Sequence, residues 1–206
     1  MRVNRLALVK ELFLNNCIMF GEFVLSSGKK SSFYIDLRIV PSIPELYCKV
    51  INTYIQYIKA NNIVFDKICG IATAGLPIAS VISYNLSKPL IYVRKETKDY
   101  GRKKIIEGYY ERGDRILLID DVATTGKSLV NAINILREEG CIVSDALVFV
   151  DREQGASLEL SQLGVKLHAI LKVSEILSAL LHEKAITKEQ YSKAISELGS
   201  EFEPAL

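Results

Sequence analysis

The chain has 206 residues, of which 49% are hydrophobic, enough apolar material for one sizeable domain with a full core. Its 26 lysines and arginines nearly balance its 24 aspartates and glutamates, so the net charge is only +2. This balance excludes a nucleic-acid binder that works through overall charge, and any basic function must be local.

The N-terminal segment MRVNRLALVKELF predicts a helix over residues 6–15 rather than a secretory signal, because Lys10 and Glu11 interrupt its apolar run. The next segment, FVLSSGKKSSFYIDLR, alternates polar and apolar residues. A half-buried edge strand explains that alternation without function. A lysine and an aromatic side chain near a cleft would also suit a planar anionic base. One side of the alternation carries Tyr34, Asp36 and Arg38, and the other carries Phe33, Ile35 and Leu37.

Short apolar runs rich in β-branched residues predict strands at 67–71, 90–93, 115–119, 145–150 and 166–170. Helical periods lie between several of them, notably over 76–86 and 128–138, and two more follow at 173–181 and 187–198. Alternating strands and helices predict an α/β fold with a doubly wound, mostly parallel sheet. We expect a single domain over 1–206, with an N-terminal cap (1–40), an α/β core (60–172) and C-terminal helices (173–206) that join the cap over a cleft.

The uncharged run over 68–87 has the length of a membrane span. Its internal Gly70, Gly75, Pro77 and Asn85 favour a strand, a turn and a buried helix instead. We therefore expect a soluble protein without a membrane segment.

The four cysteines show no C-x-x-C spacing and have apolar neighbours, which predicts buried free thiols in a reducing cytoplasm and no zinc site. They are Cys17, Cys48, Cys69 and Cys141. The two histidines, His168 in a strand pattern and His182 in a helical one, are interpreted as structural.

The segment ILLIDDVATTGKSL (116–129) ends like a nucleotide-binding P-loop, but the position where that loop needs its first glycine is Asp121. A strand that feeds a helix near Lys127 still makes an anion site, because free backbone N–H groups and the helix dipole point at it. Asp120 and Asp121 can accept hydrogen bonds from sugar hydroxyls beside that anion. The sequence therefore predicts a sugar-phosphate site rather than a triphosphate site.

Polar loops follow four of the predicted strands, and the carboxyl ends of parallel strands are where such sheets bind ligands. The loop RKETKDYGRKK carries six basic residues and is longer than a connection needs, as in lids that close on a polyanion, although a solvated hairpin is the plain alternative. GIATAGLP is either a tight turn or a backbone cradle. In DREQGA, Arg152 either forms a surface ion pair with Asp151 or grips a carboxylate or carbonyl of a second substrate.

Together these segments resemble the orotate phosphoribosyltransferase family over essentially the whole chain. LLIDDVATTGKSL is similar to the phosphoribosyl pyrophosphate (PRPP) motif of type I phosphoribosyltransferases, and FVLSSGKKSSFYIDLR, RKETKDYG and VDREQGA are similar to segments of the orotate subfamily. The lid and DREQG look most like the phosphoribosyltransferase half of UMP synthase. Because the chain ends at Leu206, we expect a single activity without a decarboxylase domain.

The resemblance implies a type I phosphoribosyltransferase fold with a hood, and transfer of the phosphoribosyl group of PRPP to orotate in UMP biosynthesis. Asp120 and Asp121 would hold the ribose hydroxyls, and residues 124–128 the 5-phosphate. The implied PRPP positions are Asp120, Asp121, Val122, Ala123, Thr124, Thr125, Gly126, Lys127, Ser128, Arg94, Lys95, Lys98, Thr73, Ala74 and Gly75. The implied catalytic positions are Lys98, Tyr100, Asp120 and Asp121, and the implied orotate contacts are Thr124, Arg152, Tyr34 and Lys29.

The resemblance also implies Mg²⁺ as cofactor, held mainly by substrate and water rather than by protein ligands. It implies a cytoplasmic homodimer in which part of each lid closes on the neighbouring subunit's site, with no nucleic-acid partner. Three positions depart from the pattern of many relatives. Ser26 and Ala74 stand where many relatives have lysine. Lys29 or Lys30 would then replace the charge missing at Ser26, and the lid would provide more of the positive charge on pyrophosphate. Tyr100 stands where many bacterial relatives have histidine, so we expect it to hydrogen-bond rather than transfer protons.

Two other functions agree with the residues alone. The first is transfer to a purine or to uracil instead of orotate. The second is a regulatory protein that senses PRPP on the same fold and binds nucleic acid, which predicts an added basic segment. A plain scaffold would leave four polar loops at strand ends without a role.

Overall fold

A computed structural model of the chain describes residues 5–24, 28, 30–94 and 105–199. A six-stranded sheet in the order β5-β4-β3-β6-β7-β8 forms its centre. The strands are β3 (Lys67–Ile71), β4 (Leu90–Val93), β5 (Ile106–Glu107), β6 (Arg115–Ala123), β7 (Ile142–Asp151) and β8 (Lys166–Lys172). All neighbouring strands pair in parallel except β4 and β5, which confirms the predicted doubly wound, mostly parallel sheet.

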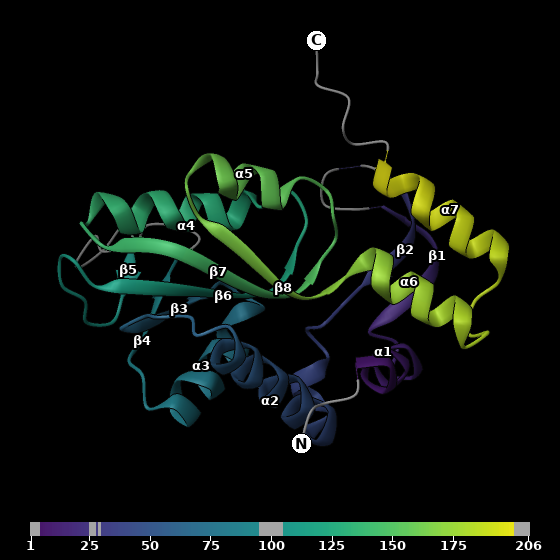
Figure 1. The fold of residues 1–206 in the computed structure, drawn as a ribbon, viewed down its shortest axis with the longest axis horizontal. Coiled ribbons are helices and arrows are strands. Elements are labelled where there is room, and N and C mark those ends of the chain that lie inside the picture. Colours follow the sequence, from purple (N-terminus) through teal and green to yellow (C-terminus); the bar gives the residue numbers. More distant parts are fainter. Residues whose placement is uncertain (1–4, 25–27, 29, 95–104, 200–206) are drawn as a thin grey trace, which may run out of the picture.

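Helices cover both faces of this sheet (Figure 1), and residue alternation along the central strands explains why. Leu117 and Ile119 of β6 belong to the core under α2 (Pro44–Ala60) and α3 (Gly75–Leu86). Ile116 and Leu118 belong to the opposite core, under α4 (Lys127–Glu138) and α5 (Ala156–Gln162). Each such buried side chain contributes roughly 1.5 to 3 kcal/mol through the hydrophobic effect, so a strand apolar on both faces is stable only in the middle of three layers.

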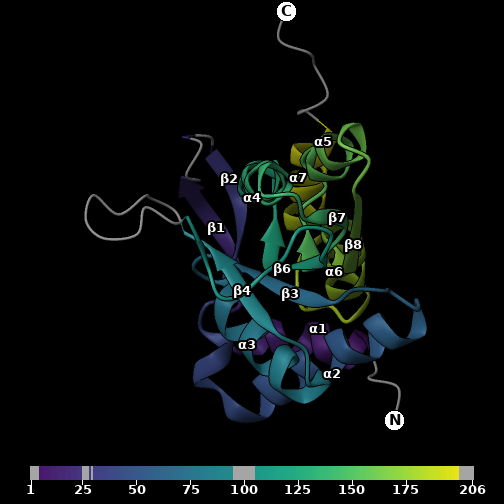
Figure 2. The ribbon, with the colours of Figure 1, turned by 90° about the vertical axis from the view of Figure 1, so that its left-hand side faces the viewer.

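A second group of elements, called the hood below, lies at one end of the sheet. It contains α1 (Arg5–Leu14), the antiparallel pair β1 (Ile18–Val24) and β2 (Lys30–Ile35), the short helix η1 (Val40–Ser42), α6 (Val173–His182) and α7 (Lys188–Gly199). Figure 2, turned by 90°, also shows β1 and β2 standing apart from the central strands. The N-terminal strands and the C-terminal helices therefore lie together, although the whole central sheet separates them in sequence.

Most predicted elements are confirmed within a few residues, and two differences matter for the site. The strand predicted at 115–119 continues to Ala123, so the acidic pair lies inside β6 rather than after it. The 17-residue helix α2 was not predicted, although its buried residues Leu46, Val50, Tyr54 and Ile58 recur at helical spacing. α2 covers the sheet beneath β6, as its contacts with Asp120 show below.

The uncharged run over 68–87 is indeed a strand and a buried helix, β3 and α3. None of the helices in the described part of the chain has the length and apolarity needed to cross a membrane. Cys17, Cys69 and Cys141 are buried free thiols as predicted, but Cys48 is exposed. The prediction for Cys48 was wrong because its apolar neighbours in sequence lie on the other side of the amphipathic helix α2.

The buried His168 has a structural role, as its strand context indicated. Its Nε2 atom lies 2.7 Å from Oδ1 of Asp145, and its ring makes an edge contact with Tyr57 of α2. These contacts join β8, β7 and α2.

Candidate active site

The carboxyl ends of β4, β3, β6 and β7 are neighbours in the sheet, so the loops that follow them meet at one edge. Three of the four predicted loops lie within the described residues. Of the fourth, the basic loop after β4, the structure describes only Arg94 and the segment from Ile105 on. Lys95, Lys98 and Tyr100 lie outside the described residues, as do Ser26 and Lys29.

The acidic pair lies near the end of strand β6, three residues before the loop that follows it. Asp120 is only 8% exposed, and its Oδ1 accepts a hydrogen bond from the backbone N–H of Asp121 at 2.9 Å. Burial raises the pKa of Asp121 above its ordinary value, while the positive charge of Arg38 acts in the opposite direction. Two adjacent carboxylates are thus held at the strand end, one of them in a site that disfavours its own charge. Such a site favours a ligand that donates hydrogen bonds or brings positive charge.

The loop after β6 leads directly into the N-terminus of α4. Gly126 stands at the N-cap with φ of 79°, and a Cβ atom there would lie 3.1 Å from Cα of Ala156. A side chain would therefore strain both the backbone and its packing. Thr125, Lys127 and Ser128 are exposed around this turn, and Thr124 is half-buried. The predicted strand, turn and helix start are therefore present, with a twelve-residue helix beginning at Lys127. That this helix N-terminus binds an anion stays a prediction.

The loop after β3 packs directly against the acidic strand. Gly75 begins α3, and a Cβ atom on it would lie 2.6 Å from the carbonyl oxygen of Ile119 and 2.9 Å from Oδ1 of Asp120. Only glycine permits this approach. Thr73 is exposed, Ala74 is half-buried, and the peptide bond between Ala72 and Thr73 is cis. The absence of a side chain at Gly75 therefore lets this loop pack against the carboxylate of Asp120.

The strand β2 presents the alternation that the sequence predicted. Phe33, Ile35 and Leu37 are buried, whereas Tyr34 and Asp36 are half-buried and Arg38 is exposed. The ring of Tyr34 stacks on Phe23 of β1 with 5.5 Å between centroids. Arg38 donates to both carboxylate oxygens of Asp36 at 2.7 Å and to the Tyr34 hydroxyl at 3.1 Å.

Arg38 is a candidate site residue that the sequence interpretation placed on the Tyr34 side of the alternation but did not select. Its charge acts on Asp121, and its hydrogen bonds hold the pKa of Asp36 below the usual value. The signal was present in the alternation of FYIDLR, which puts Arg38 on the same side as Tyr34.

Arg152 is buried rather than paired on the surface. Its side chain is 4% exposed, and the guanidinium carbon lies 4.7 Å from the ring centroid of Phe33, a cation–π contact with the hood strand. The backbone N–H of Arg152 donates to the carbonyl of Ala123 at 2.8 Å. The surface ion pair considered for Asp151 and Arg152 is therefore wrong, and Arg152 links β2 to the end of β6. Asp151 is itself buried, which raises its pKa.

Arg94, the first residue of the basic loop, donates to Oε1 of Glu107 at 2.9 Å. This pair closes the antiparallel contact between β4 and β5. A polyanion that binds Arg94 must therefore compete with the Glu107 carboxylate.

Comparison with known proteins identifies the family. The profile of the phosphoribosyl transferase domain matches residues 42–163. The orotate phosphoribosyltransferase of Sulfurisphaera tokodaii is 48% identical over 179 residues, which cover 87% of this chain and 90% of that protein. This chain belongs to the orotate phosphoribosyltransferase family. The orotate phosphoribosyltransferase of Saccharolobus solfataricus is 46% identical over 86% of this chain and 89% of that protein.

Solved structures of orotate phosphoribosyltransferases and UMP synthases show the same fold. The crystal structure of orotate phosphoribosyltransferase from Aeropyrum pernix matches with a TM-score of 0.73 and 37% identity, covering 84% of this chain and 98% of that one. UMP synthase from Leishmania donovani matches with a TM-score of 0.85 and 38% identity, covering 95% of this chain but 42% of that one. The type I phosphoribosyltransferase fold expected from the motifs is confirmed.

Proposed function

We propose that this chain transfers the phosphoribosyl group of PRPP to orotate, producing orotidine 5'-monophosphate and pyrophosphate in the biosynthesis of UMP. One observation carries the proposal: the acidic pair stands near the end of β6, which leads into the N-terminus of α4, and the buried Arg152 is tied to the last residue of that strand by its backbone hydrogen bond to Ala123. A ribose held by the first two elements presents its C1 carbon toward a base held by the third.

The acidic pair binds the ribose of PRPP. Asp120 and Asp121 accept hydrogen bonds from the 2- and 3-hydroxyls, while Val122, Ala123 and the turn of residues 124–128 hold the 5-phosphate. In the reaction the bond from ribose C1 to the pyrophosphate oxygen breaks and a bond to the orotate nitrogen forms, and the proton of that nitrogen passes to the departing pyrophosphate. Positive charge builds on the ring as pyrophosphate departs, so nearby carboxylates stabilise the transition state.

Orotate lies between the hood and the loop after β7. Arg152 donates paired hydrogen bonds to a carbonyl or carboxylate of orotate, and Thr124, Tyr34 and Lys29 complete the contacts. A guanidinium that is already buried and oriented loses little entropy on binding a planar anion. This positions the nitrogen in line with C1.

Pyrophosphate is held on the other side of the ribose. Thr73, Ala74 and Gly75 contribute backbone groups, and Arg94, Lys95 and Lys98 contribute positive charge. Lys98 acts mainly in the transition state by balancing charge on the leaving group, and Tyr100 forms a hydrogen bond rather than transferring a proton. Closure of the basic loop also excludes water that would hydrolyse PRPP.

Mg²⁺ is the cofactor of this reaction. Among the residues that the structure describes, no group of three or more histidine, cysteine, aspartate or glutamate side chains gathers into a metal site. The acidic pair supplies two carboxylates at most, which fits an ion that usually keeps substrate oxygens and water as ligands. The ion supplies charge neutralisation on the pyrophosphate; positioning of ribose and base is the work of the side chains.

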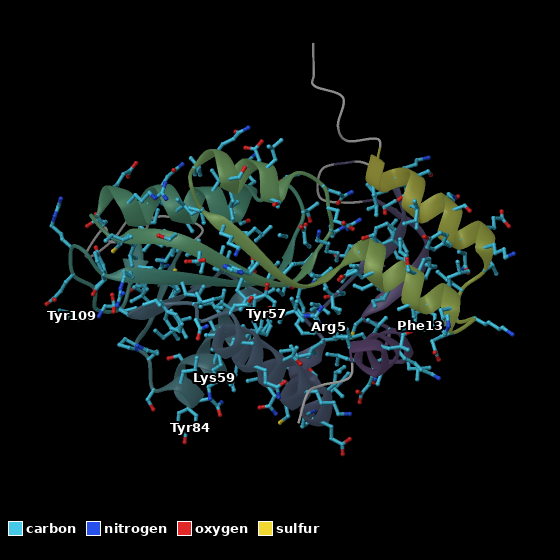
Figure 3. The ribbon with its side chains drawn as sticks, in the orientation of Figure 1. Arg5, Phe13, Tyr57, Lys59, Tyr84 and Tyr109 are labelled. Atoms are coloured by element: carbon cyan, nitrogen blue, oxygen red, sulfur yellow. The ribbon has the colours of Figure 1, made fainter. Side chains whose placement is uncertain are left out.

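The active enzyme is a cytoplasmic homodimer in which basic-loop residues of one subunit reach the site of the other. Exposed apolar side chains support a contact surface. Tyr84 is 85% exposed and projects outward from α3 (Figure 3), and Val64 is 62% exposed in the connection after α2. Burying such groups is favourable in an obligate interface.

A base panel tests the proposed reaction. Purified protein is mixed with PRPP and Mg²⁺ and with orotate, uracil, adenine or hypoxanthine, and products are separated by mass. We expect orotidine 5'-monophosphate from orotate, loss of turnover when Mg²⁺ is chelated, and no nucleotide from the other bases. A nucleotide formed only from another base would assign the chain to that base. PRPP binding without turnover of any base would favour a PRPP-sensing protein.

A further inference from the structure

The C-terminal helix α7 reaches the hood strand through one carboxylate. Oε1 and Oε2 of Glu197 accept from the backbone N–H of Ser32 at 2.9 and 3.1 Å, and Oε2 lies 2.9 Å from the Ser31 hydroxyl oxygen. Both serines are buried, at 5% and 8% exposure. Hydrogen bonds to a charged acceptor with little water access are among the stronger ones in proteins.

The position of these bonds follows from an irregularity in the hood. β1 and β2 pair regularly from Ile18 with Ile35 to Phe20 with Phe33, and again from Phe23 with Ser31. Between these pairs, two residues of β1 face Ser32 alone, which is the arrangement of a β-bulge. The Ser32 N–H is bonded to Glu197 instead. The helix thus takes the place of a strand partner at the irregular point of the hood.

The Ser31 hydroxyl connects this anchor to Arg152. Its oxygen lies 3.5 Å from Nη2 of Arg152, and also 2.8 Å from the carbonyl oxygen of Phe33. A hydroxyl has one hydrogen, which it gives either to Phe33 or to Glu197. When the hydrogen points to the carboxylate, as the charge of Glu197 favours, the lone pairs of the oxygen remain available to the Arg152 guanidinium.

Two side chains of β2 therefore contact the guanidinium of Arg152: the ring of Phe33, with its centroid at 4.7 Å, and the hydroxyl of Ser31 at 3.5 Å. Both belong to the segment that Glu197 holds. A shift of this segment would move these two contacts together, whereas neither contact involves the acidic pair or the helix N-terminus of α4.

We infer that Glu197 is a positioning residue for the recognition of the base, acting through Ser31 and Phe33 on the guanidinium of Arg152. The inference rests on the proposed function, in which Arg152 binds orotate. It predicts that Glu197 acts on the orotate subsite and not on the PRPP subsite.

Steady-state kinetics with both substrates varied test this. Glu197→Gln keeps the size of the side chain but replaces one acceptor oxygen by an NH₂ group. This group is a donor and would face the Ser31 hydroxyl or the Ser32 backbone N–H, which are donors in the present arrangement. We expect KM for orotate to rise about five- to twentyfold while KM for PRPP changes less than twofold. Glu189→Gln, an exposed glutamate in the first turn of the same helix, serves as the matched control and should leave both constants unchanged.

A double-mutant cycle with Arg152→Lys identifies the route. If Glu197 acts through Arg152, adding Glu197→Gln to Arg152→Lys should raise KM for orotate by less than twofold further. Full multiplication of the two effects, or equal increases of both KM values for Glu197→Gln, would overturn the inference. Should Glu197→Gln fold poorly, Ser31→Ala replaces it in the same cycle and breaks the link without altering α7.

The same data separate the inference from the proposed function. If wild-type protein does not turn over orotate, or Arg152→Lys leaves KM for orotate unchanged, the proposed role of Arg152 fails and the inference fails with it. If Arg152→Lys raises KM for orotate but neither Glu197→Gln nor Ser31→Ala does, only the inference fails.

Discussion

The phenolic hydroxyl of Tyr54 donates a hydrogen bond to the main-chain carbonyl of Asp120, with 2.6 Å between the two oxygens. Tyr54 is fully buried on α2, and its ring lies 5.6 Å from that of Phe149. Burial, reinforced by the carboxylates of Asp121 and Asp120, raises the pKa of Tyr54 well above its usual value. The hydroxyl therefore stays protonated at physiological pH and ties α2 to the backbone of the acidic strand.

Tyr54→Phe should weaken both the fold and the site. The ring and its packing remain, so the loss is that of one buried hydrogen bond, about 1 to 2 kcal/mol in the free energy of unfolding. Because the bond fixes the backbone of Asp120, we also expect kcat/KM for PRPP to fall severalfold. Urea unfolding and steady-state kinetics measure the two effects. Tyr57→Phe on the same helix is the control, and an equal loss of activity there would contradict the special role of Tyr54.

Gly75→Ala should damage the site through a steric clash. The new Cβ atom would lie 2.6 Å from a backbone oxygen of β6, which cannot move aside as a flexible side chain can. We expect a loss of about 1 to 3 kcal/mol in stability, as for other overpacked positions, and displacement of the Asp120 carboxylate. Gly21→Ala in β1, whose Cβ would meet only the Phe23 ring at 3.4 Å, should be far milder. Similar losses for both variants would refute the proposed contact.

Asp121→Asn should trade activity for stability in a pH-dependent way. Burial raises the folded-state pKa of Asp121, so the folded protein holds the proton more tightly than the unfolded chain. The stability contributed by the protonated form is complete below the unfolded pKa and is lost as pH rises through the folded pKa. Asparagine cannot ionise, so Asp121→Asn does not lose this stability as the pH rises.

We therefore expect Asp121→Asn to be more stable than wild type near pH 7, with the gain shrinking toward pH 4. Its kcat should fall by roughly a hundredfold or more, as when one preorganised electrostatic group is removed from a transition state. Thermal unfolding between pH 4 and 8 measures the first effect. A variant less stable than wild type at pH 7, with no dependence on pH, would show that the Asp121 charge is well satisfied in the fold.

Arg38→Gln should affect activity more than stability. Arg38 forms an exposed pair with Asp36, and such pairs contribute about 0 to 1 kcal/mol. Its charge, however, acts on Asp121, so we expect KM for PRPP to rise about three- to tenfold. Arg115→Gln removes a similar exposed pair, with Asp66, at the opposite end of β6. If both variants changed KM for PRPP equally, a local effect of Arg38 on the acidic pair would be ruled out.

The sequence predicted the parallel strands of the central sheet and most helices because each carries its own local signal, whereas β1 and β5 were not predicted. Parallel strands buried on both faces are continuous apolar runs, and their carboxyl ends identified the loops that meet at the site. Asp120, Gly126 and Arg152 were proposed as site residues in this way, since each lies at or shortly after the end of such a run. The extension of β6 through the acidic pair was missed because two aspartates read as the end of a strand; pairing with β7 overrides that local preference.

The supporting contacts could not be predicted from local patterns. Tyr54 and Asp120 are 66 positions apart, and Glu197 and Ser31 are 166 apart, so no periodicity relates them. The bulge frees the backbone N–H of Ser32 to bond Glu197. Its position depends on the register of β1 with β2, which the alternation of β2 alone does not determine. The structure thus adds the residues that hold the site in place.

The most direct measurement is the loss of orotate ultraviolet absorbance on mixing purified protein with orotate, PRPP and Mg²⁺. We expect turnover by wild-type protein and by Asp145→Asn, whose carboxylate lies beside His168 away from the acidic pair, and at least a hundredfold loss for Asp120→Asn. Folded Asp120→Asn protein that turns over orotate as fast as wild type would contradict a ribose site at this strand end, and absence of orotate turnover in wild-type protein would contradict the proposed reaction itself.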